Sequence, residues 1–495
     1  MGGIVWGDGP TGSSWKERVD MAGESQAQKT FFKGSFYGWW IVLGGFLMMC
    51  TCYAAYANCL PVFQTHIVAS LNESLEGGFT IGDYTTISGL AGMVGVIFTL
   101  FIGVLIDKVP ARGLCSTLVI LGAIMLFGYG LVSQPWHLAI LAGLSGILVT
   151  IGLRLAISVV ISNWFNLKRG LATSLALCGS GFGGAILATV VSYLIEACGW
   201  RTAFFILGII VLVIALPIPI VFYRTRPSDL GMLPYGAELT DEERKAAEGG
   251  EKKQAEPNIN VAVGFKECKK SLAFWLLVIG FLLIGTINGA VTQEMVANNT
   301  TVGGWDTVTA GYFQSLYLVV VVIGKVALGE IFDRFGCKFA SVVASVCCAL
   351  ACICLCFPST LWGPIGASVF FGVGTCIATL GPSVMITRTF GRLDSGTLVG
   401  IAGFATGLGG VIGAIVAGQV FDATGTFNGA WIFCVVCSVL LMACLVASVT
   451  GGHKKVAKLV TAGAPLIDES GQVVEGSNSQ DAYRVIDGGK NVEEI

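Results

Sequence analysis

Charged residues are scarce in this 495-residue chain: they make up 12% of it, whereas 54% of the residues are hydrophobic. Soluble domains carry about 25% charged residues, so the sequence lacks the polar surface that a water-soluble protein needs. Histidine is also scarce, and His66, His137 and His453 all lie at predicted helix ends or in a tail, where they form no catalytic constellation. The chain is therefore not expected to be an enzyme.

Metal ligands are lacking as well. The 17 cysteines lie mostly within apolar runs, and Cys352, Cys354 and Cys356 have neither the spacing of zinc ligands nor a histidine nearby. Thiols in such runs behave as small hydrophobic residues. The sequence predicts no metal site, no other cofactor and no disulfide framework, and no nucleic-acid partner is expected.

The chain has long apolar runs instead. A helix needs about 20 residues to cross a bilayer, and each run is long enough. Six runs lie in residues 37–223 and six more in residues 272–450. Residues 1–36, 224–271 and 451–495 are polar, which predicts an N-terminal tail, a linker and a C-terminal tail. The sequence therefore predicts an all-α membrane protein with twelve transmembrane helices in two six-helix bundles.

The basic residues lie almost entirely in the polar segments between the predicted spans. If the N-terminus is cytoplasmic, nearly all lysines and arginines fall in cytoplasmic loops, the linker and the tails, with Arg201 as the exception in an outer loop. Basic residues mark the cytoplasmic side of membrane proteins. We therefore expect both termini in the cytoplasm and the protein in the plasma or inner membrane of the cell.

Two motifs recur in the second half of the chain at one common offset. Gly103, Asp107 and Arg112 correspond to Gly329, Asp333 and Lys338, and Gly181, Gly183 and Gly184 correspond to Gly407, Gly409 and Gly410. This indicates a duplicated bundle with pseudo-symmetric halves, an architecture that suits alternating access. The glycine strings at 179–184 and 403–413 are expected to allow close helix contacts.

The loops that begin at Gly103 and Gly329 resemble the G-x-x-x-D-[RK]-x-G-x-[RK] signature of the major facilitator superfamily, although the first copy has Pro110-Ala111 where Gly-x is usual. Residues 37–42 and 164–172 are similar to motifs of its monocarboxylate porters and oxalate:formate antiporters, with Gly170 in place of a proline. The resemblance implies the major facilitator fold. It also implies a monomeric secondary transporter of a small organic anion, a mono- or dicarboxylate, that acts as an exchanger or an ion-coupled importer.

The signature loops predict a conformational latch, in which an acid, a basic partner and a neighbouring helix N-terminus hold the cytoplasmic side shut in one state. Its predicted members are Gly103, Asp107, Arg112, Gly329, Asp333, Arg334 and Lys338. The alternative is that these loops only set the orientation of the protein, which the basic residues alone would do.

Two basic residues, Lys325 and Arg154, lie inside predicted spans, where a charge costs about 2.5–3.5 kcal/mol on insertion scales and marks a functional cavity. The resemblance places Lys325 where the porters have an arginine associated with the substrate carboxylate. Alternatively, Lys325 extends to the inner interface, and Arg154 is a structural hydrogen-bond hub. Polar and aromatic residues that complete the predicted site, each of which would also suit helix packing, are Tyr53, Tyr56, Asn58, Asn288, Gln293, Gln314 and Tyr317.

Carboxylates are absent from the middle of every predicted span, since Glu196, Glu294, Glu330 and Asp422 all fall near helix ends. Val321 stands where the porters have an aspartate linked to proton coupling. The remaining candidates for the coupled ion are a counter-anion, which would be exchanged, or a proton that binds to Lys325 itself.

Two other functions are weighed. A drug/proton antiporter of the same superfamily would have a proline at Ser180 and an arginine at Gly143, and a fixed cation suits anions better than cationic drugs. A non-transporting receptor would need a signalling domain. The linker and the tails are too short to form a folded one.

Overall fold

The structure, a computed structural model, describes residues 36–461, apart from 77, 109, 148–152, 166–168, most of 225–264 and 391–394. Two short strands lie beyond this range. They are β1 (Leu466–Ile467) and β2 (Val473–Val474), which pair antiparallel with Leu466 opposite Val474.

The first half is helical in all its described segments. Its elements are α2 (Tyr37–Met48), the π-helical η1 (Met49–Tyr53) and η2 (Ala55–Cys59), α3 (Leu60–Ser74), α4 (Ile81–Lys108), α5 (Ala111–Gly130), α6 (Pro135–Ser145), α7 (Arg154–Trp164), α8 (Arg169–Cys198), α9 (Trp200–Ala215) and α10 (Pro217–Val221). Pro217 removes a backbone donor at the junction of α9 and α10, which ends the longer helix there.

The second half repeats this all-helical pattern after two short elements, η4 (Pro227–Leu230) and α12 (Phe265–Cys268). Its elements are α13 (Leu272–Ala297), the π-helical η5 (Asn298–Val302), α14 (Thr307–Leu355), α15 (Trp362–Gly374), α16 (Cys376–Phe390), α17 (Ser395–Thr424) and α18 (Asn428–Thr461). The last helix thus continues beyond residue 450, where the sequence predicts the start of the C-terminal tail.

Nine helical stretches among the described residues are long and apolar enough to cross a membrane. One of them, α14, has 49 residues and is about 73 Å long at a rise of about 1.5 Å per residue, more than twice a hydrocarbon core of about 30 Å. It is interrupted at Gly336, whose φ of 76° suits glycine, so it folds back and crosses twice. The helical membrane fold is confirmed, while the count of twelve spans stays a prediction, because α4 and the α6–α7 pair contain undescribed residues.

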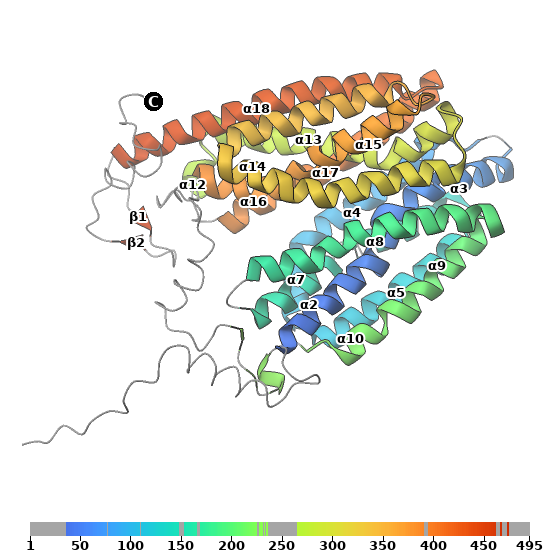
Figure 1. Ribbon diagram of the computed structural model, residues 1–495, viewed down its shortest axis with the longest axis horizontal. Coiled ribbons are helices and arrows are strands. Elements are labelled where there is room, and N and C mark those ends of the chain that lie inside the picture. The colour runs from blue at the N-terminus through green and yellow to red at the C-terminus, as the bar shows by residue number, and fades with distance from the viewer. Residues whose placement is uncertain are drawn as a thin grey trace, which may run out of the picture.

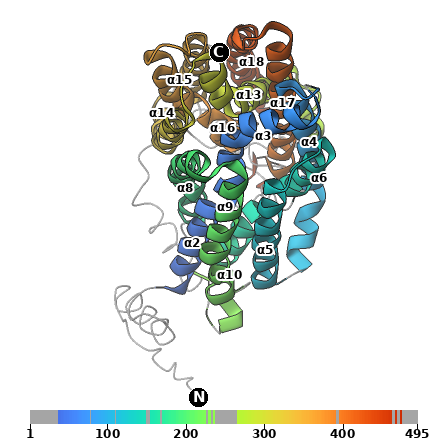
Figure 2. The ribbon, with the colours of Figure 1, turned by 90° about the vertical axis from the view of Figure 1, so that its right-hand side faces the viewer.

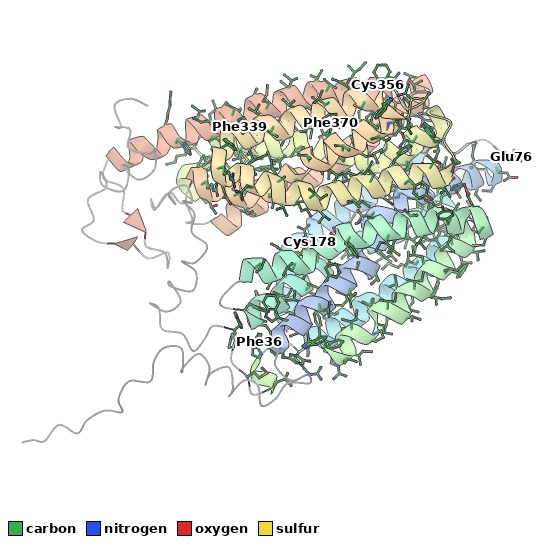
Figure 3. All side chains as sticks on the ribbon, viewed as in Figure 1. Phe36, Glu76, Cys178, Phe339, Cys356 and Phe370 are labelled. Carbon is green, nitrogen blue, oxygen red and sulfur yellow. The ribbon has the colours of Figure 1, made fainter. Side chains whose placement is uncertain are left out.

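Large apolar side chains remain exposed around the outside of both halves, where the sticks of Figure 3 project from the helices. Val213, Val326 and Val439 are 68%, 75% and 54% exposed. An apolar surface of this extent belongs in lipid rather than in water. The protein is therefore a multi-pass membrane protein.

Among the described residues, the hydrogen bonds between the two halves lie at one end. We call the end where the chain enters at Tyr37 and leaves at Thr461 the tail end, and the opposite end, where α3 finishes at Ser74 and α14 begins, the far end. In Figure 1 the first half (blue to green) and the second half (yellow to red) lie side by side at the far end, on the right, and diverge towards the tail end. Figure 2 looks onto the far end and shows α4 beside α17.

Glycines bring the helices within each half into backbone contact. A Cβ atom added at Gly183 of α8 would lie 1.9 Å from the carbonyl oxygen of Cys50, and one at Gly409 of α17 would lie 2.0 Å from that of Leu282. Only a residue without a side chain permits such an approach. The expected role of the two glycine strings is confirmed at these positions, and it makes each half a closely packed unit.

Replacing Gly409 should destabilise the second half. We expect Gly409→Ala to cost about 1–3 kcal/mol, because the new methyl group forces α17 and α13 apart. Gly403→Ala in the same helix is the matched control, since no atom lies within 4 Å of a Cβ atom there. Thermal unfolding of the purified protein, followed by loss of the monodisperse peak, measures both; equal unfolding temperatures would show that the helices do not pack this closely.

Candidate functional site

The far end is closed by hydrogen bonds between the halves, first between α3 and α13. The Gln64 Nε2 donates to both carboxylate oxygens of Glu294, at 3.1 and 2.9 Å, and Gln293 Nε2 donates to Gln64 Oε1 at 2.7 Å. Gln64 and Glu294 are both fully buried. A further contact joins Thr307 Oγ1 to His66 Nε2 at 3.3 Å.

A second set of contacts joins α4 to α17 at the same end. Asp422 accepts hydrogen bonds from Thr80 Oγ1 at 2.6 Å and from the backbone N–H of Gly82 at 2.9 Å. Its carboxylate therefore lies at the N-terminus of α4, where free N–H groups and the helix dipole favour a negative charge. One turn on, Gln419 Nε2 donates to Thr86 Oγ1 at 3.2 Å.

A third set joins α8 to α14. The hydroxyls of Thr189 and Ser315 are 2.8 Å apart, Ser315 Oγ donates to the carbonyl of Ala185 at 2.6 Å, and the hydroxyls of Tyr193 and Tyr312 are hydrogen-bonded. We call these three sets together the far-end gate. The hydrogen bonds recorded between the halves in the described part of the chain all belong to this end.

A cavity of about 350 Å³ lies between the halves below the gate, within the size range of small-molecule sites. It is lined by α4, α13, α17 and Gly146, with polar but uncharged groups from Thr85, Thr292 and Gln293. Gln293, a predicted site residue, thus connects the gate to this cavity.

Lys325 lies on the face of α14 that is directed at the other half. Leu318 and Val322, seven and three residues earlier, contact Gly181 of α8, and positions so spaced share one helix face. Ile323, two residues away and so on the opposite face, is exposed and apolar. Lys325 is therefore one turn nearer the tail end than the last of these contacts, where the halves part.

The Lys325 ammonium is partly exposed and forms no hydrogen bond or ion pair with a described residue. It is close enough to Cys376 for an electrostatic interaction. The adjacent Thr375, between α15 and α16, donates through Oγ1 to Asn288 Oδ1 of α13 at 2.6 Å. The predicted site residues Lys325 and Asn288 thus each lie near the junction of α15 and α16.

Arg154 is exposed at the start of α7, in the other half. Ile157 and Ile161, three and seven residues further along α7, are buried. Arg154 lies nearly as many residues from the far end of its span as Lys325 does, counted from Pro135 and Thr307.

The other predicted site residues do not gather around Lys325. Tyr56 donates to the carbonyl of Gly122 and Asn58 to that of Ser180, at 2.9 Å for the latter, so both side chains bond within the first half. They lie in η2, and Tyr53 ends η1, where π-helical turns re-aim the side chains.

Two further predicted site residues, Tyr317 and Gln314, are buried in α14. The Tyr317 ring packs on Phe371 of α15, with ring centroids 5.2 Å apart. The buried side-chain oxygen of Gln314 has no hydrogen-bond partner among the described residues. It is therefore free to accept a hydrogen bond.

The predicted latch residues lie at the tail end and make no recorded contact with the opposite half. Asp333 pairs with Arg388 of α16, which also donates to the carbonyl of Phe332 at 2.6 Å, and Arg334 pairs with Glu330 on its own helix. The remaining latch residues are Gly329, Lys338 and Arg112, of which the last two are exposed, and Gly103 and Asp107, whose side chains lie outside the described residues.

Glu294 is the residue that sequence reasoning missed. The sequence places it near a helix end, but the helix continues through η5 to Val302, so Glu294 lies about two turns inside. Its partner Gln64 carried no signal, because a single glutamine in an apolar run suits many packing roles. The pairing brings together residues from the first and second halves.

An engineered disulfide should report the closed far end. We expect Thr189→Cys with Ser315→Cys to form a disulfide readily in the resting protein, since their hydroxyls already touch. The matched pair at the tail end of the same two helices, Leu171→Cys with Phe335→Cys, should form little. Cleavage at a protease site engineered between the halves, followed by a non-reducing gel, measures both; the opposite order of yields would reverse the assigned conformation.

Comparison with known proteins agrees with this geometry. The family model of the Major Facilitator Superfamily matches residues 45–382 and 304–472. The chain is 25% identical to the Monocarboxylate transporter 12 of Rattus norvegicus, over 85% of this chain and 86% of that protein. It is 24% identical to the MFS transporter asaE of Aspergillus flavus, over 79% and 82%.

A solved structure shares the fold. That of the nucleoside transporter NupG superposes with a TM-score of 0.62 at 14% identity, and covers 84% of this chain and 99% of that one. At this identity the likeness concerns the fold alone. Together with the family match, it confirms the resemblance predicted from the signature loops: the chain belongs to the Major Facilitator Superfamily.

Proposed function

We propose that this protein is a secondary transporter that moves a small organic anion, a mono- or dicarboxylate, by alternating access. The observation that carries the proposal is Lys325, which is partly exposed on the face of α14 turned towards the other half and is unpaired among the residues that the structure describes. A charge within the bilayer is costly unless it lines a water-filled cleft, and an ammonium there attracts anions.

We propose that Arg154, exposed at the start of α7, supplies a second positive charge to the cleft. It comes from the first half and Lys325 from the second, at similar depths. An anion between them would contact both halves, which is what a carrier needs if its substrate is to stabilise the movement of one half against the other. Asn288 and Thr375, beside Lys325, offer polar groups that would orient a carboxylate.

The names of the relatives support the same substrate class. The rat and human proteins at 25% and 24% identity are monocarboxylate transporters. A lysine cannot form the paired hydrogen bonds of an arginine with a carboxylate, but it supplies the same fixed charge. We infer an exchanger or an ion-coupled importer, acting as a monomer in the plasma or inner membrane of the cell.

The conformational cycle follows from the ends of the cleft. In this structure the far-end gate is closed, and on the predicted orientation the far end is the outer face. When that gate opens, we propose that the tail end closes through the latch, with Asp107, Arg112, Asp333 and Lys338 as its charged members. The Asp333–Arg388 pair keeps the tail ends of α14 and α16 together during the movement.

Removing the charge at Lys325 should weaken binding of the anion. A hydrogen bond to a charged group contributes about 1.5–3 kcal/mol, so Lys325→Ala should weaken the apparent affinity by about ten- to a hundredfold, and Lys325→Arg should retain part of it. The measurement is exchange of labelled formate, oxalate, lactate, pyruvate and larger dicarboxylates in proteoliposomes.

Lys454→Ala is the control, because this exposed lysine of α18 lies outside the cleft. We expect its exchange rate to equal that of the unchanged protein. Exchange of none of these anions, or full activity in Lys325→Ala, would contradict the proposal.

A further inference from the structure

The far-end gate contains a carboxyl group for which the proposed transport step has no use. We propose that Glu294 is a proton-binding site that controls this gate: its carboxyl group carries a proton while the gate is closed and releases it to water when the far end opens. The inference deepens the proposed function, since it names an ion linked to the cycle, and it rests on that function only for the alternation of the two ends.

Burial is the first reason. Glu294 is fully buried, and the amide of Gln64 is the only hydrogen-bond donor that reaches it from the described residues. An ionised carboxylate has about four acceptor sites to satisfy, and taking one out of water without a cation costs several kcal/mol. A protonated carboxyl group avoids most of this cost.

The charges around Glu294 are the second reason, because none of those recorded near it is positive. The titratable groups that interact with it electrostatically are Tyr84 of α4 and Asp422 of α17. On α3, His66 is bonded to Thr307 and interacts with Glu196 instead. On α14, Asp306 caps its own helix by accepting from the N–H of Thr309 at 3.0 Å.

Position is the third reason. Glu294 and its partner Gln64 lie in different halves: Glu294 belongs to α13 and Gln64 to α3. Opening the far end must separate these helices, which exposes the carboxyl group to water and restores its ordinary acidity. The closed gate therefore binds one more proton than the open gate, and the proton passes between the Glu294 carboxylate and water on the far side.

Asp422 provides the contrast within the same gate. It is exposed, and it accepts hydrogen bonds from Thr80 and from the backbone N–H of Gly82 at the N-terminus of α4. Glu294 is buried and accepts only from the Gln64 amide among the described residues, so it is the carboxyl group whose proton we propose to follow closure of the gate.

The sign of the effect follows from linkage. Because the closed state holds the extra proton, raising the pH favours the open state, and above the pH at which closed-state Glu294 ionises the effect levels off. Glu294 ionises at a lower pH in the open gate than in the closed gate. Between these two pH values, the ratio of open to closed gates should rise by up to about tenfold for each pH unit, because one proton is released.

The test measures the conformation directly, without any anion, so failure of the carboxylate proposal leaves it intact. Fluorophores on non-natural amino acids at Leu131 and Trp362, which are 66% and 78% exposed at the far end of opposite halves, report the gate by energy transfer. The full chain is placed in lipid nanodiscs and titrated between about pH 5 and 9, which spans the range in which a buried carboxyl group titrates. We expect the far ends to separate as the pH rises.

Glu294→Gln, which keeps the shape of the protonated acid, should hold the gate closed at every pH. Asp422→Asn, the matched control, should open more often but keep the pH dependence. A pH-independent gate in the unchanged protein, which requires no variant to fold, would overturn the proposal. So would a Glu294→Gln protein that follows the pH as the unchanged protein does.

Discussion

A bilayer cannot solvate a charged side chain, and this constraint places the described charges of the structure. Asp422 lies at the far end, and Asp333 pairs with Arg388 at the tail end. On the proposed function, Lys325 and Arg154 line the cleft. The gate between the halves consists of hydrogen bonds among amides, hydroxyls and carboxyl groups. Such contacts exchange readily for water when the gate opens, whereas a buried ion pair would hold the halves together more firmly.

The contacts within each half are of a different kind. Gly183 and Gly409 let α8 and α17 meet the backbone of the first helix of their own half, with no side chain between them. Packing of this kind cannot slide, because each backbone fits only one position of its neighbour. On the proposed function, movement is then confined to the surface between the halves, and the two halves rock as units around the cleft.

Much of the fold could be predicted from the sequence, because hydropathy, the basic loops and the repeated Gly-x-x-x-Asp motif each report a local property. The site was less accessible. Lys325 stood out because a charge in an apolar run is rare, but Tyr56 and Asn58 looked equally suitable and bond within their own half. Glu294 could not be recognised, because its burial depends on Gln64 in the opposite half, and no local pattern records which helices meet.

The unpaired cation also bears on whether the carrier exchanges or carries net flux. On the proposed function, closing the tail end around an empty cleft would enclose Lys325 without a counter-charge, which costs several kcal/mol. A bound carboxylate removes that cost, so the loaded carrier changes conformation more easily than the empty one. Exchange of one anion for another then outpaces net uptake. Glu294 acts on the opposite gate and does not relieve this penalty, because its proton neutralises a carboxylate and leaves the Lys325 ammonium unpaired.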